Sequence, residues 1–318
     1  MKRALCLAVA MVLLLTGCAS GPKIVPIESL SPAQTAANVY TPVPSQEATP
    51  TPAPIVVARI EESGMSIGSR INPPMGYSRT FETENSFGTF MRKYPVRMAG
   101  AQVMRYDETA REDASAAAVL DVSLGKKNHE GPAGAVARLY AEYFYGRQEF
   151  SKVKFTIGRG FEFTFDKWRK GNKLYAKGND LSWVSGGEDS NGKDNFRSYL
   201  STLFVYISMS TLKKDMVRIE DVDGEAIQVG DVFIGETAEG KELAVMVADL
   251  CINDETGERM MLLVQGGSPA QQLHVVDNPY DVSIAPWYSC EFDMTLKTPD
   301  VELDIEDRYR FKALVKEE

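Results

Sequence analysis

Two long segments of the chain carry apolar residues at the three- and four-residue spacing of an α-helix. In residues 131–146, Val136, Leu139, Tyr140 and Phe144 form one such stripe. The segment has a proline near its start, which suits a first helical turn, and ends with a glycine, which suits a helix end. The pattern therefore predicts an amphipathic helix over this segment.

The second segment, residues 194–216, repeats the apolar stripe. Asp194 or Asn195 can cap its start, and two lysines lie near its end, where they complement the helix dipole. A shorter helix is predicted in residues 86–94, because Pro95 prevents it from continuing.

Most of the remaining pattern is typical of β-strands. Residues 153–158 and 161–165 alternate as half-buried strands do, whereas residues 242–252 and 260–265 are almost uninterrupted apolar runs, as in central strands. The polar residues between the two runs indicate a hairpin, and residues 271–276 predict a further strand. The strands form an antiparallel meander after helices placed earlier in the chain. We therefore predict an α+β fold with helices packed on a central antiparallel sheet.

The first residues have the pattern of an export signal. Lys2 and Arg3 precede an apolar run that is too short to span a bilayer comfortably. The run ends in "LTGC", and small residues before a cysteine are typical of a bacterial lipoprotein signal. We expect residues 1–17 to be removed and Cys18 to be acylated, which would anchor the protein to a bacterial membrane, inner or outer. An ordinary signal peptide with a chance cysteine is the alternative.

Residues 18–58 have the composition of a tether. Proline, threonine and alanine dominate its second half, and prolines favour extended backbone without a packed core. The remaining residues, 59–318, show no internal repeat and no second linker. We therefore expect them to fold as a single domain.

The net charge limits the classes of partner that the chain can bind, and its cysteines limit the disulfides that it can form. The chain has 35 Lys and Arg against 44 Asp and Glu, a formal net charge of −9. This balance argues against a nucleic-acid partner and against binding anionic lipid through charge alone. Outside the cytoplasm, Cys251 and Cys290 are able to form a disulfide. Two buried free thiols are the alternative.

Several short motifs recur in an order that resembles one bacterial family. They are RINPPMGYSR, SFGTFMRKYPV, RLYAEYFY, SYLSTLFVY, GDVFI, AVMVAD, LLVQGGSPAQQLHVV and PWY. Together they resemble an uncharacterised lipoprotein family, domain of unknown function 4846, across residues 70–311. That family has no established reaction that could be carried over to this chain.

The resemblance does imply a layout for a site. Typical members carry a cysteine at the head of the "RLYAEY" helix and a histidine just before the "AVMVAD" strand. This layout is similar to that of NlpC/P60-type and other papain-like hydrolases, in which a helix N-terminus stabilises the thiolate and the imidazole holds its proton. In this chain the cysteine position falls on Pro132 and the histidine position on Leu243. Neither side chain can do that chemistry, so the resemblance implies a papain-like domain with a degenerate site.

Other residues are candidates for lining the groove that an active relative would use. Gln265 matches a glutamine of the family and could orient a histidine or donate to an oxyanion. His129 precedes Pro132 by three residues, although its polar turn favours exposure to solvent. Trp183 and Trp287 lie in loop-like contexts, where they could stack on sugar or peptide faces or instead fold onto the core.

A relocated catalytic pair is the remaining route to hydrolysis. Cys251 and His274 are the candidate thiol and imidazole. Cys251 lies in an apolar strand, where burial would raise its pKa, and we expect His274 to face solvent. The sequence has no nucleophile elbow, no calcium loop and no glycine-rich phosphate loop. We therefore predict no cofactor and no metal site.

Three functions remain open at this stage. The first is a membrane-anchored envelope lipoprotein whose inactive papain-like domain binds peptide or cell-wall material such as peptidoglycan. The second is an active cysteine hydrolase or amidase that uses Cys251 and His274. The third is a structural component of an envelope complex, held by a protein partner.

Overall fold

The computed structural model of the protein describes residues 59–221 and 226–315. The predicted signal peptide, the acylated Cys18 and the tether of residues 18–58 lie outside these residues. The described residues belong to one compact unit, Ile55–Glu318.

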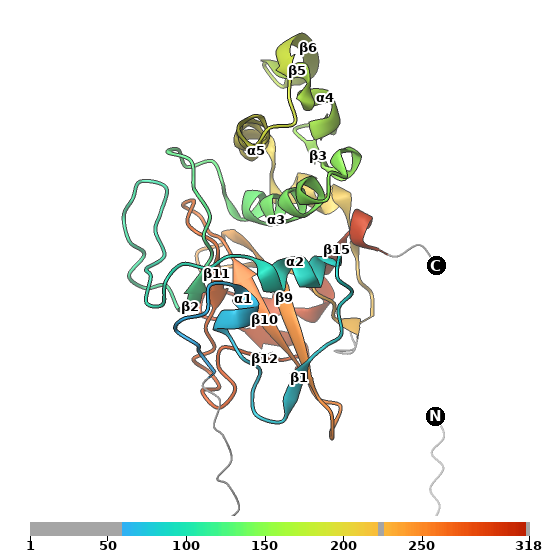
Figure 1. Cartoon of the computed structure of the whole chain (residues 1–318). Helices are drawn as coiled ribbons and strands as arrows, with labels where there is room; N and C mark the ends of the chain where they lie inside the picture. Colours follow the sequence, from blue (N-terminus) through green and yellow to red (C-terminus); the bar gives the residue numbers. More distant parts are fainter. Residues whose placement is uncertain (1–58, 222–225, 316–318) are drawn as a thin grey trace, which may run out of the picture. The chain divides into compact units, whose positions relative to one another are not determined.

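An antiparallel sheet forms the centre of this unit (Figure 1). Within the described residues it has nine strands in the order β2-β11-β10-β9-β8-β15-β7, with β1 beside β9 and β12 beside β10. Their bounds are β1 (Tyr77–Arg79), β2 (Ala116–Val119), β7 (Met216–Arg218), β8 (Asp231–Glu236), β9 (Glu242–Asn253), β10 (Arg259–Gln265), β11 (His274–Val276), β12 (Tyr288–Ser289) and β15 (Arg308–Phe311).

The meander predicted from the apolar runs is present as β8, β9, β10 and β11. These strands pair antiparallel with their neighbours, and Met246 of β9 lies opposite both Val232 of β8 and Val264 of β10. The prediction of an α+β fold with an antiparallel sheet is therefore confirmed. The strands β1, β2, β12 and β15 are too short to leave a clear period in the sequence.

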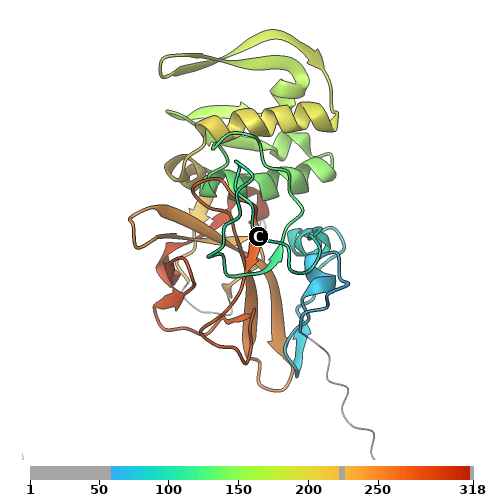
Figure 2. The same cartoon turned by 90° about the vertical axis from the view of Figure 1, so that its left-hand side faces the viewer.

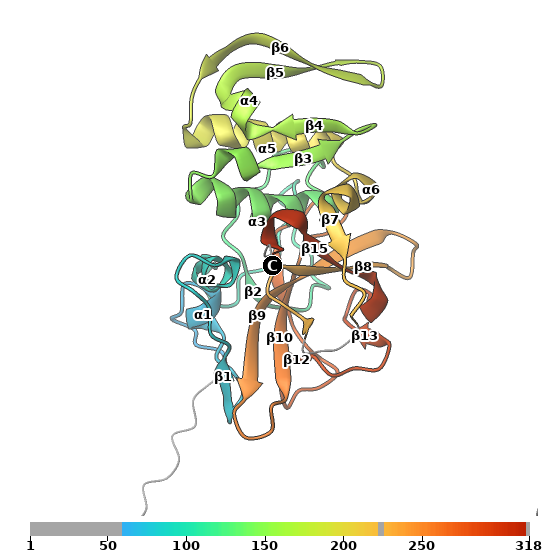
Figure 3. The same cartoon turned by 90° about the vertical axis from the view of Figure 1, so that its right-hand side faces the viewer.

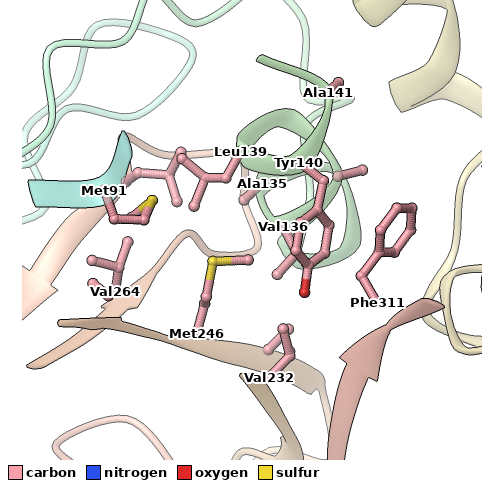
Figure 4. Packing of buried hydrophobic residues seen from close by; sticks show 14 of the residues in the cluster. Met91, Ala135, Val136, Leu139, Tyr140, Ala141, Val232, Met246, Val264 and Phe311 are labelled. Carbon is pink, nitrogen blue, oxygen red and sulfur yellow. The ribbon is translucent and has the colours of Figure 1, made fainter. Parts of the chain in front are cut away.

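Helix α3 (Pro132–Gly146) lies across one face of the sheet and begins and ends where the sequence pattern predicts. Its Val136 and Tyr140 contact the strand residues Met246 and Val232 in one apolar cluster (Figure 4). Tyr140 also stacks on Phe311 of β15, with ring centroids 4.4 Å apart. The remaining helical elements are α1 (Ile67–Arg70), α2 (Phe87–Lys93), α4 (Phe165–Arg169), α5 (Lys193–Tyr206), α6 (Met209–Leu212), η1 (Phe150–Lys152), η2 (Lys213–Asp215), η4 (Ile305–Asp307) and η5 (Lys312–Leu314).

A second layer covers the side of α3 that faces away from the sheet (Figures 1 and 3). It consists of α5 and two hairpins, β3 (Lys154–Ile157) with β4 (Phe161–Thr164), and β5 (Lys170–Lys177) with β6 (Asp180–Asp189). Aromatic contacts join it to α3: the Tyr145 and Phe196 rings stack with centroids 4.0 Å apart.

The helix predicted over residues 194–216 is shorter in the structure. α5 begins after Gly192, which takes the N-cap position without a side-chain hydrogen bond, so neither Asp194 nor Asn195 caps it. The helix ends at Tyr206, because the backbone of Ile207 is extended, and Ser208 then caps the start of α6 in a capping box. Serine competes for backbone hydrogen bonds, and this local signal interrupts an apolar stripe that continues past it.

The two faces of the sheet belong to different apolar clusters. Along β9, Ala244, Met246 and Ala248 belong to the cluster under α3, whereas Leu243, Val245 and Val247 belong to the cluster on the opposite face. The second face is covered in part by β13 (Thr295–Lys297) and β14 (Glu302–Asp304), whose Leu296 and Leu303 join that cluster. Both faces are therefore buried, which explains the uninterrupted apolar runs of β9 and β10.

Among the described residues, no helix has the length and apolar character needed to cross a bilayer.

Candidate binding groove

A groove of about 1130 Å³ lies at the start of α3 and along α5. In Figure 2, the segment that precedes α3 runs in front of α3 and α5. We call this feature the α3–α5 groove. Its lining comes from the end of α2, residues 121–130, α3 and α5: Phe90, Lys93, Tyr94, Pro95, Asp121, Val122, Ser123, Leu124, Gly125, Lys126, Lys127, His129, Glu130, Arg138, Glu142, Tyr145, Lys193, Phe196, Arg197, Leu200, Ser201, Thr202, Phe204, Val205 and Tyr206.

The floor of the groove is apolar. Phe196, Leu200 and Phe204 recur every four residues on α5, so they lie on one face of that helix, and all three are buried. α3 offers Gly134 where Phe204 approaches: a Cβ atom there would lie 3.0 Å from the Phe204 ring. Because glycine has no side chain, α5 can pack closely against α3 at this point, and this close packing sets the depth of the groove.

A buried ion-pair network forms one wall. Arg138 of α3 is 8% exposed and donates from Nε and Nη2 to the two carboxylate oxygens of Glu130, both at 2.5 Å. Its Nη1 donates to Glu142 at 3.1 Å, and Glu142 accepts a hydrogen bond from the Tyr94 hydroxyl at 2.6 Å. The Arg138 guanidinium also lies 5.1 Å from the centre of the Phe204 ring.

This network fixes the charges in the wall of the groove. Burial raises the pKa of the Glu130 carboxyl, and the Arg138 guanidinium opposes that rise. Burial likewise raises the pKa of Tyr94, which therefore remains a hydrogen-bond donor to Glu142. A bidentate arginine–carboxylate pair is geometrically specific, so Arg138 and Glu130 hold each other in one relative orientation.

The rim of the groove carries exposed basic side chains. Lys93, Lys126, Lys127 and Lys193 are exposed, and no ion pair joins any of them to another residue in the described part of the chain. Arg197 is also exposed and pairs with Asp194 at 3.1 Å. An apolar floor under a positive rim suits a ligand that has an apolar body and negatively charged ends.

The structure does not bring the expected catalytic positions together. Pro132 occupies the first turn of α3, beside the groove-lining His129 and Glu130. Leu243 is 5% exposed and belongs to the cluster on the opposite face of the sheet from α3. The reason is the two-residue period of β9, which directs Ala244 toward α3 and Leu243 away from it.

Gln265 lies on the same far face as Leu243, in a buried polar cluster. Its side-chain nitrogen donates to Asp300 Oδ2 and lies 3.4 Å from Nε2 of His274. Asp300 also accepts from Arg111 Nη1 at 3.0 Å. Gln265 is therefore remote from the α3–α5 groove and holds together the polar groups behind the sheet.

His274 is 0% exposed, so the expectation that it faces solvent is wrong. Its Nδ1 lies 3.2 Å from the carbonyl oxygen of Gln272, and its Nε2 faces the Gln265 amide nitrogen, which can only donate. The ring is therefore a neutral imidazole with its proton on Nδ1. The alternation along β11 places His274 on the face that the Asp300 segment covers.

We expect the free energy of unfolding to fall between pH 6.5 and about 4 because of His274. Burial lowers the pKa of His274 to about 4 from an ordinary 6.5. In that window the unfolded chain takes up a proton that the folded chain refuses, so stability present above pH 6.5 is lost as the pH falls, by up to about 3 kcal/mol. Denaturant unfolding at several pH values measures this slope.

The chain offers a matched pair of variants for this test, since it has two histidines. His274→Gln should flatten the acidic part of the stability curve, whereas His129→Gln, at an exposed position, should leave it unchanged. The assignment is wrong if both variants keep the wild-type slope.

The relocated thiol–imidazole pair is not formed. Cys251 lies opposite Met260 on β10, whereas His274 lies opposite Gln265, and five residues along a strand span about 17 Å. Cys251 is 0% exposed, and burial raises its pKa far above that of a reactive thiol. Cys251 and Cys290 are both free, so they form no disulfide with each other.

The remaining aromatic and histidine candidates have different environments. His129 is exposed and lines the α3–α5 groove. Trp287 is 0% exposed in the core, and its Nε1 donates to Asn72 at 2.9 Å. Trp183 lies on β6, in a segment expected to be a loop, and stacks on Phe163 with centroids 5.3 Å apart. Neither tryptophan is among the lining residues of the groove.

Sequence reasoning missed the residues that give the groove its wall and rim. Arg138 and Glu142 are four residues apart on α3, which is a detectable signal for an ion pair on a helix. Glu130 and Tyr94 join them only through the fold. In the described part of the chain, no group of three or more His, Cys, Asp or Glu residues is placed to hold a metal ion.

Comparison with known proteins identifies the family of the chain. The family model described as "Domain of unknown function (4846)" matches residues 67–310, and the chain therefore belongs to this family. No curated protein and no solved structure matches the chain significantly.

Proposed function

We propose that this chain, as a member of the family described as Domain of unknown function (4846), is a binding module of the bacterial cell envelope. Its ligand is peptide or cell-wall material held in the α3–α5 groove. The observation that carries the proposal is the combination of a groove of about 1130 Å³, an apolar floor and an unpaired basic rim. The lipoprotein signal with Cys18, expected from the sequence, supports the proposal, because an anchor of this kind would hold the domain near such material.

The ligand chemistry follows from the lining. Val205, which is 47% exposed, and the partly exposed Phe90 and Tyr206 offer an apolar surface to aliphatic side chains or to the methyl groups of a peptide. Lys126 and Lys127 at the rim attract carboxylates from solution. We therefore propose an anionic peptide, of the kind that crosslinks cell-wall glycan, in preference to a neutral sugar chain.

We further propose a papain-like arrangement of helix and sheet in which no catalytic pair is assembled at the groove. Support comes from α3 packed across an antiparallel sheet with a groove at its N-terminal end. Pro132, in the first turn of α3, offers no nucleophile. Leu243 lies on the opposite face of the sheet, so a histidine there could not have served this groove. The separation of Cys251 from His274 argues against the active hydrolase.

Charge reversal at the rim tests the proposed function. We expect the double variant Lys126→Glu, Lys127→Glu to bind an anionic muropeptide about tenfold more weakly at low salt, because two attractive charges become repulsive. Titration calorimetry with purified muropeptides measures this loss. Lys177→Glu on the β5–β6 hairpin makes an exposed charge change outside the groove and should leave the affinity unchanged.

A second variant blocks the floor. Val205 lines the groove and is 47% exposed, so Val205→Arg adds bulk to the groove without disturbing the core. The proposal is contradicted if neither variant alters binding. It is also contradicted if the muropeptide is cleaved and Cys251→Ala abolishes that cleavage. Stable capture of an envelope protein by the groove, with no muropeptide binding, would favour the structural role instead.

A further inference from the structure

A second pocket lies on the free edge of the central sheet, away from the α3–α5 groove. Strand β2 is the last strand of the sheet, paired with β11 on one side. On its other side, Arg97 N donates to Val119 O at 2.8 Å, and this segment then turns away at Met98. Among the described residues, no strand continues the pairing along Ala116–Ala118.

The pocket occupies the place that the missing strand would take. It has a volume of about 200 Å³ and is lined by the whole of β2, by Met98, by residues 100–103 and by Arg70, Arg111, Glu112 and Ala114. β2 has the sequence Ala-Ala-Ala-Val, so no large side chain fills the space beside its backbone. The register with β11 skips Ala117, and a bulge of this kind distorts the ladder and leaves a residue unpaired.

Arg70 supplies a buried positive charge to this pocket. The residue is 1% exposed, and its Nη2 donates to the carbonyl oxygens of Gly64 at 2.6 Å and Arg97 at 3.0 Å. Its Nε has no hydrogen-bond partner, and no carboxylate lies within ion-pair distance of the guanidinium in the described residues. Glu61, the nearby acidic residue, is exposed and accepts from Ser63.

An uncompensated buried cation is costly unless a negative group joins it. The other arginine of the pocket, Arg111, already has a partner, because it forms a bidentate pair with Asp300. Apart from the electrostatic interaction with the exposed Glu61, Arg70 has no carboxylate partner in the described part of the chain, and its unpaired Nε–H is free to donate to a ligand carboxylate.

We propose that the edge of β2 and Arg70 form a binding site for the carboxylate end of a short, extended peptide with small side chains. The peptide backbone pairs with Ala116–Ala118, continuing the ladder that Arg97 begins, and the carboxylate contacts Arg70. Addition of a strand to an open edge provides affinity through main-chain hydrogen bonds. A volume of about seven waters, at ~30 Å³ each, limits the ligand to small residues.

The test uses the purified full chain and two dipeptides, N-acetyl-Ala-Ala with a free carboxylate and the same compound as its amide. We expect the carboxylate form to bind about tenfold more tightly, because the hydrogen bonds to Arg70 are charge-assisted. Titration should shift the NMR signals of the Ala116–Ala118 amides. Inorganic phosphate serves as the probe for an anion without a backbone.

Two variants distinguish the roles of charge and shape. Arg70→Gln should remove the preference for the carboxylate, since the guanidinium is lost. Arg70 also holds two loop carbonyls, so this variant could lose part of its fold. Glu112→Gln avoids that problem, because Glu112 is exposed and lines the pocket. This variant removes a negative charge that would repel the carboxylate of the ligand, so it should raise the affinity for the carboxylate form a few-fold.

Equal binding of the dipeptide and its amide would overturn the proposal, as would shifts confined to residues outside β2. Binding of phosphate with no binding of either dipeptide would show a simple anion site and would also overturn it. An unchanged affinity in Glu112→Gln, together with an unchanged preference in Arg70→Gln, would exclude these residues from any site. None of these outcomes depends on whether the α3–α5 groove binds muropeptide.

Discussion

Replacement of Arg138 by methionine lowers the free energy of unfolding by about 3–5 kcal/mol, because it leaves the Glu130 carboxylate buried without its counter-charge. Glu130 is 4% exposed, and both of its oxygens accept from Arg138. Chemical denaturation of the wild type and the variant measures the loss. The same change should weaken ligand binding, since Glu142 and Phe204 lose the guanidinium that they contact.

Two further variants show that the loss comes from the buried charge. Combining Arg138→Met with Glu130→Gln should recover most of the stability, because no charge then remains buried without a partner. Arg147→Met removes an arginine at the exposed end of the same helix, where the pair with Glu149 is worth about 0–1 kcal/mol. A loss in Arg138→Met no larger than that in Arg147→Met would contradict the role assigned to the network.

Replacement of Tyr140 by alanine is expected to cost about 3–5 kcal/mol of stability, the usual range for removing a buried ring. Tyr140 is 0% exposed between α3 and the sheet, stacks on Phe311 and donates from its hydroxyl to Gly230 O at 2.7 Å (Figure 4). Because α3 carries one wall of the groove, its loosening should also reduce ligand binding. Thermal unfolding and muropeptide titration measure the two effects.

Tyr140→Phe separates the ring from its hydroxyl. This variant keeps the stacking on Phe311 and leaves Gly230 O without a donor, at a cost of about 1–3 kcal/mol. Tyr175, which is 51% exposed on β5, provides a matched tyrosine-to-alanine change that should stay within about 0.5 kcal/mol. If Tyr140→Ala is as mild as Tyr175→Ala, α3 is not held to the sheet by this residue.

The proposed ligand sites differ in what holds the ligand. The α3–α5 groove offers an apolar floor and a rim of exposed lysines, which favours broad recognition of anionic peptides. The pocket at β2 offers a backbone edge and one buried guanidinium, which favours a small, defined end group. A cell-wall peptide combines an anionic character, which suits the groove, with a small end group, which suits the pocket at β2. The experiments above test each site separately.

The sequence by itself determined the elements whose signals are local. The apolar stripe of residues 131–146, with a proline in its first turn, predicted α3 with its bounds, and two continuous apolar runs predicted β9 and β10. The family motifs likewise follow from the order of residues along the chain, and the family match covers residues 67–310. A period of three to four or of two residues depends only on neighbours in sequence, which is why these predictions held.

Tertiary structure decided which side of each element is covered and what meets there. The alternation along β11 could not show that the face carrying His274 lies beneath the Asp300 segment, because residues 274 and 300 meet only in the folded chain. In the same way, alignment with the family motifs predicted that Leu243 lies beside the site at the start of α3. The pleat of β9 instead directs its side chain to the face of the sheet opposite α3. The groove wall unites Tyr94, Glu130 and Glu142 around Arg138, and only long-range packing could assemble it.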